Sequence, residues 1–277
     1  METRALDGAS CVSVAVGADG IDVVVEASER LVDAQDRLEE AHAPADDESE
    51  PNTAHAPTLL VRRHGQPIVR VRLPADVIAG IASLELLKHP PRDGEATALA
   101  LACDGSLHML ALPLAAAAAR TPLRRLTLMR SSVRYIACGA EHAVAATSSA
   151  LFEWRVGQPA LRELRLQDSL AVAEAGSGWR VGDVAAGGDA SAAIMVRVAP
   201  VPRVDTRVWL WGEGPQVPWG RTESPREVER LRSRQIVSLS LGQAHAVCCA
   251  LDGTAWSWGF GGFGELGTAL ADASVVR

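Results

Sequence analysis

The sequence is poor in lysine, tyrosine and phenylalanine. Lys88 is the only lysine among 27 basic residues, and the chain has one tyrosine and three phenylalanines. No polybasic tail is present, so electrostatic binding to nucleic acid is not indicated. The formal net charge of −7 arises from one stretch, because residues 26–50 contain ten acidic and two basic side chains. The remainder of the chain is close to neutral.

Long apolar segments and paired cysteines are also missing. The longest apolar stretch, residues 107–119, is too short to span a bilayer and contains Pro113. No signal-peptide pattern opens the chain. The cysteines are Cys11, Cys103, Cys138, Cys248 and Cys249. None forms a Cys-x-x-Cys pair, so neither a disulfide scaffold nor a zinc site is predicted. We expect a soluble protein of the cytoplasm or nucleus.

Residues 235–267 have the pattern of a series of short strands. Residues 236–240 alternate between apolar and polar side chains, as a half-buried strand does. Residues 246–251 form a continuous apolar run of strand length. Asp252 and Gly253 predict a two-residue type I′ hairpin turn, and an aromatic-rich strand follows up to Trp258. This order of strands and turns is typical of one blade of a β-propeller.

The same pattern recurs upstream. A glycine is followed three residues later by a histidine at Gly139 and His142, and again at Gly242 and His245. A tryptophan closes the pattern at Trp154, Trp211 and Trp258, and Leu110 takes that place in a weaker copy. These closing positions are 44, 57 and 47 residues apart, counted from Leu110 onward. Self-similarity at this spacing, with strands and no helices, indicates a propeller.

The repeat resembles that of the regulator of chromosome condensation (RCC1-like) family of β-propellers. The family repeat has a glycine, a histidine three residues later, a turn glycine, an aromatic-Trp-Gly closure and a terminal Gly-x-Leu-Gly. The clearest copies are residues 94–112, 133–155, 182–220 and 235–267, and the last is complete. The residues that carry the repeat are Gly139, His142, Trp154, Gly187, Trp211, Gly212, Gly242, His245, Gly253, Trp258, Gly259 and Gly267. Ala190 replaces the histidine in one copy, and Arg155 replaces the glycine after Trp154.

The resemblance implies an all-β fold in which residues 1–277 form a single propeller domain. Seven blades of about 50 residues need a longer chain. We therefore expect about five to seven blades, some of them shortened, or an incomplete or truncated propeller. Residues 27–57 are predicted to be a disordered acidic insertion, with a short helix at residues 28–41.

Two patterns that suggest chemistry have structural explanations. Gly259 to Gly264 matches Gly-x-Gly-x-x-Gly, but no helix pattern follows, and a dinucleotide site requires one. These glycines are expected to form a tight turn between blades. His142 and His245 occupy equivalent places in different blades, so we expect each to bond backbone within its own blade. No catalytic grouping is recognisable. The sequence thus predicts no catalytic residue, no cofactor and no metal.

Function is then expected on the exposed loops at the rims of the propeller. The leading hypothesis is a non-enzymatic scaffold or adaptor that binds a protein partner. Aromatic and arginine side chains commonly anchor interfaces. On that basis the candidate partner-binding residues are Trp179, Trp219, Phe260, Phe263, Arg124 and Arg125.

Two alternatives follow from the resemblance. One is a guanine-nucleotide exchange factor for a small GTPase, which is the activity of the family's founding member. The other is a partner of a small zinc protein in diphthamide synthesis and tRNA wobble-uridine modification.

Overall fold

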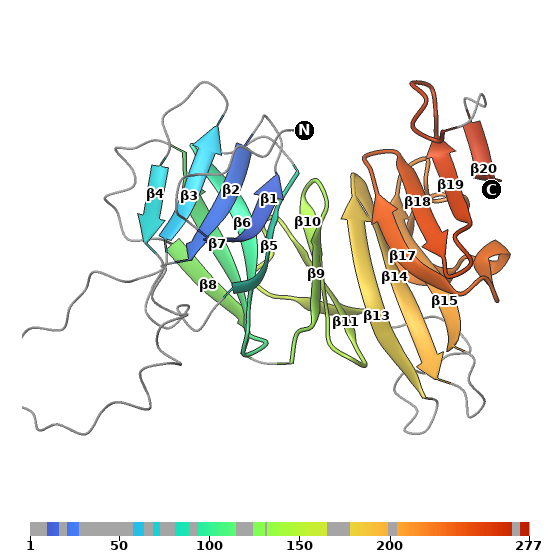
Figure 1. Ribbon diagram of the computed structural model, residues 1–277, viewed down its shortest axis with the longest axis horizontal. Helices are drawn as coiled ribbons and strands as arrows, with labels where there is room; N and C mark the ends of the chain where they lie inside the picture. Colours follow the sequence, from blue (N-terminus) through green and yellow to red (C-terminus); the bar gives the residue numbers. More distant parts are fainter. Residues whose placement is uncertain are drawn as a thin grey trace, which may run out of the picture.

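The computed structural model describes residues 10–16, 21–27, 58–63, 69–72, 81–88, 94–114, 124–130, 132–164, 178–198, 204–267 and 272–276. In these residues the strands form five sheets of four strands each, and the sheets follow one another along the molecule (Figure 1). The one helical element described is a single 3-10 turn, η7 (Glu229–Leu231). The predicted all-β propeller fold is confirmed. The predicted helix at 28–41 and nearly all of the acidic insertion lie outside the described residues.

Each sheet is one blade, and its four strands are consecutive in the sequence. Blade 1 contains β1 (Ser10–Val16), β2 (Ile21–Ala27), β3 (Thr58–Arg63) and β4 (Val69–Arg72). Blade 2 contains β5 (Ile81–Leu86), β6 (Glu95–Ala102), β7 (Leu107–Pro113) and β8 (Arg124–Met129). Blade 3 contains β9 (Tyr135–Cys138), β10 (His142–Ala146), β11 (Leu151–Arg155) and β12 (Arg162–Leu164). Blade 4 contains β13 (Trp179–Gly187), β14 (Asp189–Val198), β15 (Val204–Glu213) and β16 (Thr222–Glu227). Blade 5 contains β17 (Ile236–Leu241), β18 (His245–Ala250), β19 (Ala255–Phe260) and β20 (Asp272–Val276).

The first strands of the blades lie together at the inside of the arrangement. β1 contacts β5, β5 contacts β9, β9 contacts β13, and β13 contacts β17. The remaining strands of each blade follow outward in sequence order. Blades 1 and 5 lie at opposite ends of the molecule (Figure 1). This placement makes the third strands of the blades run in the same direction, so that their ends share one rim.

The apolar core is divided into layers between successive blades. One cluster of buried side chains joins blades 1 and 2, a second joins blades 2 and 3, a third joins blades 3 and 4, and a fourth joins blades 4 and 5. Each blade therefore buries its faces against its neighbours, as expected when a single repeat cannot cover its own apolar surface. Trp154, Trp211 and Trp258 are all buried in these layers, which confirms that they belong to the core.

Buried tryptophans also carry polar links between blades. The indole Nε1 of Trp211, in blade 4, donates to Glu153 Oε1 of blade 3 at 3.3 Å. The indole Nε1 of Trp258, in blade 5, donates to the carbonyl oxygen of Gln216 at 2.8 Å. A buried indole N–H needs such an acceptor, so these bonds fix how each blade sits on the preceding one.

The repeat histidine has a different partner from the one expected. His142 is fully buried, and its Nε2 lies 2.7 Å from Ser191 Oγ on β14 of the next blade. The expectation of a bond to backbone within its own blade is therefore wrong for His142. Burial lowers the pKa of His142, and the nearby Arg155 adds to this, although Glu153 opposes it. The imidazole thus serves as a neutral link between blades 3 and 4.

The hairpin at Asp252 and Gly253 also differs in detail. The amide of Gly253 donates to Ala250 O at 3.0 Å, and the amide of Ala250 donates to Thr254 O at 2.8 Å. Only Gly253 has a positive φ, of 82°, whereas a type I′ turn needs two such residues. The loop therefore has three residues, with a tight turn closed by a left-handed glycine. The hairpin was predicted correctly, and the turn type was wrong.

Glu153 is the centre of a charged network between blades 3 and 4. Its side chain is 2% exposed and accepts hydrogen bonds from Arg155 and Arg162, as well as from Trp211. Burial alone would raise the pKa of Glu153, but the bonds and charges of the two arginines outweigh it and hold the pKa below its usual value. Glu153 is therefore ionised and fully partnered.

The glycine after the closing tryptophan provides a test of the repeat geometry. Gly259 has a φ of 101°, and a Cβ there would lie 2.5 Å from Ala244 O. Gly220 has a φ of 78° with nothing within 4 Å of an added Cβ. We expect Gly220→Ala to lower the free energy of unfolding by about 1–2 kcal/mol, the cost of a left-handed alanine. Gly259→Ala should cost clearly more in urea unfolding, because backbone must also move. Equal losses would mean that the close approach does not matter.

Replacing Glu153 with Gln tests the network. We expect the free energy of unfolding to fall by about 1–3 kcal/mol, because buried donors lose a charged acceptor. Since the folded-state pKa is lowered, the contribution of Glu153 is complete above its usual value of 4.5 and disappears as the pH falls through the folded value. Urea midpoints should therefore depend less on pH below about pH 5 in the variant than in the parent.

The matched control is Glu163→Gln, which changes an exposed carboxylate on the neighbouring strand β12. Its unfolding free energy should stay within about 0.5 kcal/mol of the parent value. A control that loses as much stability as Glu153→Gln would contradict the assigned role of Glu153.

Candidate functional site

The candidate site lies on the rim where the third strands end. We call this rim A. It contains the ends of β11, β15 and β19 and the turns that join the first and second strands of blades 3, 4 and 5. The opposite rim, rim B, contains the turns between second and third strands, including the one at Gly253. The two rims differ in how closely their turns approach one another.

Hydrogen bonds to backbone carbonyl groups join the turns of rim A. The amide of Ala140 donates to Gly188 O at 2.7 Å, which links the turns of blades 3 and 4. Gln216 Nε2 lies 3.2 Å from Gly187 O and 3.3 Å from Gln243 O, and so links blades 4 and 5. A Cβ on Gly187 or Gly188 would meet the backbone of the blade 5 turn. The absence of side chains at these glycines lets the turns of rim A form one rigid surface.

An aromatic pair projects from rim A at blade 5. Phe263 is 90% exposed and Phe260 is 39% exposed. Their ring centroids are 6.0 Å apart in an edge-to-face arrangement. No other large apolar side chain in the described part of the chain is as exposed as Phe263.

The loop that carries this pair is tightly held. The amide of Gly264 donates to Gly261 O, and the amide of Gly267 donates to Gly264 O, so two turns follow each other. Ser257 Oγ donates to Leu266 O at 2.8 Å, and the Leu266 side chain is buried. The loop joins β19 to β20 of the same blade, so the expectation of a turn between blades is wrong. The glycines form turns, and no helix follows them within residues 259–267.

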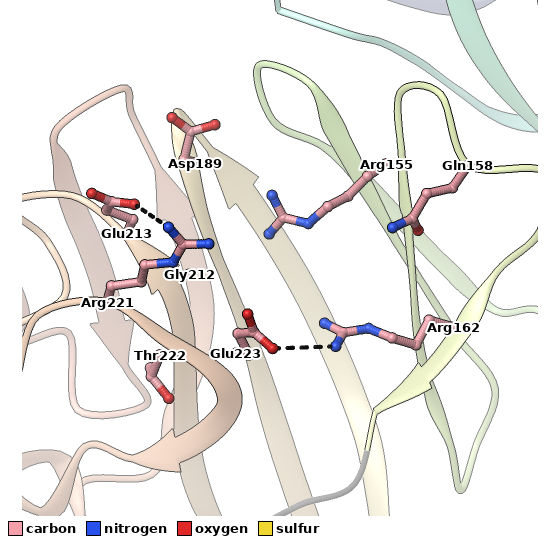
Figure 2. Close-up of a pocket in the computed structure, with 9 residues that line it drawn as sticks. All are labelled: Arg155, Gln158, Arg162, Asp189, Gly212, Glu213, Arg221, Thr222 and Glu223. Atoms are coloured by element: carbon pink, nitrogen blue, oxygen red, sulfur yellow. Dashed lines mark ion pairs between the residues drawn. The ribbon is translucent and has the colours of Figure 1, made fainter.

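A groove of about 460 Å³ opens between blades 3 and 4 on the same rim. Blade 3 contributes Arg155, Gln158 and Arg162. Blade 4 contributes Asp189, Gly212, Glu213, Arg221, Thr222 and Glu223. Figure 2 shows that the Arg155 and Arg162 side chains extend from one wall toward Asp189, Glu213 and Glu223 on the other. Eight of the nine lining residues therefore have a polar or charged side chain.

Arg155 stands where the repeat has a glycine. In the sheet registers Arg155 pairs with His142, as Gly259 pairs with His245 and Gly212 pairs with Ala190. Gly212 and Gly259 have φ values of 99° and 101°, but Arg155 does not have a positive φ. Arg155 is the last residue of β11, whereas β15 and β19 each continue one residue beyond their glycine. The departure is visible in the sequence, although the groove residues Arg155, Arg162, Asp189 and Glu213 were not among the predicted site residues.

The predicted partner-binding residues are not brought together. Trp179 is 4% exposed, with the guanidinium groups of Arg197 and Arg207 at 4.7 and 5.1 Å from its ring centre, so its expected exposure is wrong. The arginines that cover Trp179 come from the later strands β14 and β15, so the local sequence around Trp179 does not indicate its burial. Trp219 is half-buried, and Arg226 lies 5.0 Å from its ring centre.

The predicted arginines lie on another blade. Arg124 and Arg125 are in β8, the outermost strand of blade 2, instead of in a loop. Phe260 and Phe263 lie together on blade 5, with their ring centroids 6.0 Å apart. Their exposure agrees with the prediction, and their role in binding stays a prediction.

The His, Cys, Asp and Glu side chains that could hold a metal ion are scattered among the described residues. No group of three or more His, Cys, Asp or Glu side chains able to hold a metal ion occurs among them. Cys103, Cys138, Cys248 and Cys249 are free thiols. Within the same ranges, no helix has the length and apolar character needed to cross a membrane.

The chain is similar in sequence to short parts of two large proteins. No protein-family model matches it. Human HERC2, an E3 ubiquitin-protein ligase, is 26% identical over 228 residues, which is 75% of this chain and 4% of HERC2. Rat Alsin is 29% identical over 84 residues, which is 28% of this chain and 5% of Alsin. The chain thus spans only a small fraction of either relative.

Comparison with solved structures concerns the fold. Yeast RCC1 (Prp20) in complex with Kap60 superimposes with a TM-score of 0.57 at 15% identity, over 96% of this chain and 60% of that chain. A second structure of Prp20 from Saccharomyces cerevisiae, described with its binding to Gsp1p and histones, gives a TM-score of 0.56 at 16% identity. It covers 96% of this chain and 62% of Prp20. Together with the repeat and the five four-stranded blades, these similarities identify the chain as an RCC1-like repeat β-propeller.

Proposed function

We propose that this chain is a non-enzymatic interaction module that binds a protein partner through rim A. The observation that carries the proposal is the exposed aromatic pair Phe260 and Phe263 on a loop whose backbone is fixed. The Phe263 ring is 90% exposed, so its burial by a partner makes the free energy of binding more favourable. Aromatic side chains with this exposure are the usual anchors of protein interfaces.

The rigidity of the loop strengthens the argument. Two successive turns, the Ser257 bond to Leu266 O and the bond from the Phe263 amide to Glu265 Oε2 at 2.8 Å hold the backbone in place. Binding through such a loop loses little conformational entropy. The joined turns of rim A supply a firm surface around it. A scaffold or adaptor can bind its partner through polar and apolar contacts on such a rigid surface.

The two narrower hypotheses remain proposals of lower rank. Exchange activity toward a small GTPase is supported by the likeness in fold to Prp20, which binds Gsp1p. At 15–16% identity that likeness concerns the fold, so no exchange residue is transferred. For the pairing with a small zinc protein in diphthamide synthesis and tRNA wobble-uridine modification, no described residue adds support.

Site-specific cross-linking tests the proposed function. Phe263 is replaced by a photoreactive phenylalanine analogue, and adducts formed in native lysate are identified by mass spectrometry. We expect one reproducible protein adduct, and we expect Phe260→Ala in the same chain to reduce its yield. Phe260 is more than half covered and packs against Phe263, so Phe260→Ala should lower the unfolding free energy by about 0.5–1.5 kcal/mol, which leaves the chain folded.

The matched control carries the analogue at Leu251. That residue is 65% exposed and lies in the β18–β19 turn, on rim B of the same blade. Its adducts should differ from those of position 263. The same adducts from both rims, or none from position 263, would overturn the assignment of the Phe260 and Phe263 pair as the binding surface.

Measured GDP release separates a scaffold from an exchange factor. With a panel of small GTPases loaded with fluorescent GDP, we expect addition of this chain to leave the release rate unchanged. A dose-dependent acceleration for one GTPase, abolished by Phe260→Ala with Phe263→Ala, would replace the scaffold by the exchange-factor hypothesis. Buffer and an unrelated propeller serve as blanks.

A further inference from the structure

We infer that the groove between blades 3 and 4 binds a short extended segment of a protein that carries an acidic and a basic side chain close together. This inference rests on the proposed function, because it specifies the chemistry of a segment that rim A would receive. It concerns a different place on the rim from the aromatic pair. Three observations carry it: the basic wall, the acidic wall and the two sheet edges beside the groove.

The blade 3 wall offers oriented donors. A guanidinium has five N–H groups. Arg155 uses Nε and Nη2 for Glu153, at 3.2 and 3.3 Å, and Arg162 uses Nη2 for the same carboxylate at 2.9 Å. The buried carboxylate of Glu153 thus binds both guanidinium groups, and the Arg155 and Arg162 side chains are each nearly half exposed. The remaining donors, with one net positive charge, face the groove, as Figure 2 shows for both side chains.

The blade 4 wall offers acceptors. Within the described part of the chain, no hydrogen bond or ion pair engages the exposed carboxylate of Asp189, although it lies close enough to His142 to influence that side chain. Glu213 pairs with Arg221 at 3.8 Å and Glu223 pairs with Arg162 at 3.9 Å. Glu213, Arg221 and Glu223 are largely exposed, and Arg162 is nearly half exposed. Exposed pairs at such distances are weak and are easily exchanged for a ligand's charges.

The charge balance decides which ligand fits. The groove has three arginines against three carboxylates, and Glu153 lies behind them. A ligand with several negative charges would meet as much repulsion as attraction. A segment with one charge of each sign can place its acid on Arg155 and Arg162 and its base on Asp189. Charge complementarity of this kind selects partners and fixes their register.

The strands beside the groove favour an extended segment. Arg162 begins β12, and Thr222 and Glu223 begin β16, which are the outermost strands of blades 3 and 4. Among the described strands, each has a neighbour on one side only. Unpaired strand edges accept extended peptides through backbone bonds, while the flanking side chains read the sequence. A volume of about 460 Å³ suits a few residues and not a folded domain.

Peptide titration monitored by NMR tests the inference. The full chain is labelled with 15N-arginine, and the Nε–H signals of Arg155 and Arg162 are followed. The probes are nonapeptides on a Gly/Ser background with Glu and Arg two residues apart, so that both side chains share one face of an extended chain. Matched probes carry Glu and Glu, Arg and Arg, Gln and Gln, or phosphoserine and Gln at the same positions.

We expect the mixed-charge peptide to shift both arginine signals and to bind roughly fivefold more tightly than either like-charge peptide, as one additional exposed ion pair allows. Arg155→Gln and Asp189→Asn should each remove most of this advantage. The control is Arg180→Gln, which changes an exposed arginine at the other end of β13 and should leave the affinity unchanged. Stronger binding of the phosphoserine or Glu and Glu peptide would overturn the inference in favour of an anion site.

The experiment distinguishes a failure of this inference from a failure of the proposed function. If no peptide shifts the arginine signals while cross-linking from position 263 persists, the groove assignment fails and the interaction module stands. If the mixed-charge peptide binds and position 263 yields no adduct, the aromatic surface fails and the groove stands. Equal binding of the Gln and Gln peptide would also overturn the inference, because the charges would then play no part.

Discussion

Each blade depends on its neighbours to cover its apolar faces. Every buried cluster joins two successive sheets, and the indole bonds of Trp211 and Trp258 each reach into the preceding blade. A four-stranded sheet that is apolar on both faces cannot remain alone in water, so the repeat is stable only as a stack. The polar links are few, but each satisfies a buried donor, and they fix the angle at which one blade meets the next.

This constraint explains why departures from the repeat are informative. At the position of Glu153, blade 5 has Ser257, whose hydroxyl bonds the Leu266 carbonyl within its own blade. In blade 3 the longer carboxylate reaches the next blade and recruits Arg155 and Arg162. A buried charge is tolerated only with partners, so Glu153 and its arginines depend on each other. The buried Glu153 thus holds two arginines that line the groove at the surface.

Much of the fold could be predicted from the sequence, because glycines, closing tryptophans and strand alternation report local geometry. The spacing of Trp154, Trp211 and Trp258 located three blades, and Gly253 located a hairpin even though its turn type was wrong. What could not be predicted depends on contacts between distant residues. Trp179 looks exposed until Arg197 and Arg207 cover it, and nothing in the sequence shows that Asp189 faces Arg155. The signal for the groove was the missing glycine after Trp154.

The two features of rim A suit different tasks in recognition. The rings of Phe260 and Phe263 supply apolar area, which gives affinity but discriminates poorly among partners. The groove supplies opposite charges in fixed positions, which add little affinity in water but penalise a partner with the wrong charge pattern. Both features are held on turns and strand ends whose backbones are already bonded. Because neither needs to be ordered on binding, a partner that contacts both gains from each without a large entropic cost, and one that contacts only the rings is bound less selectively.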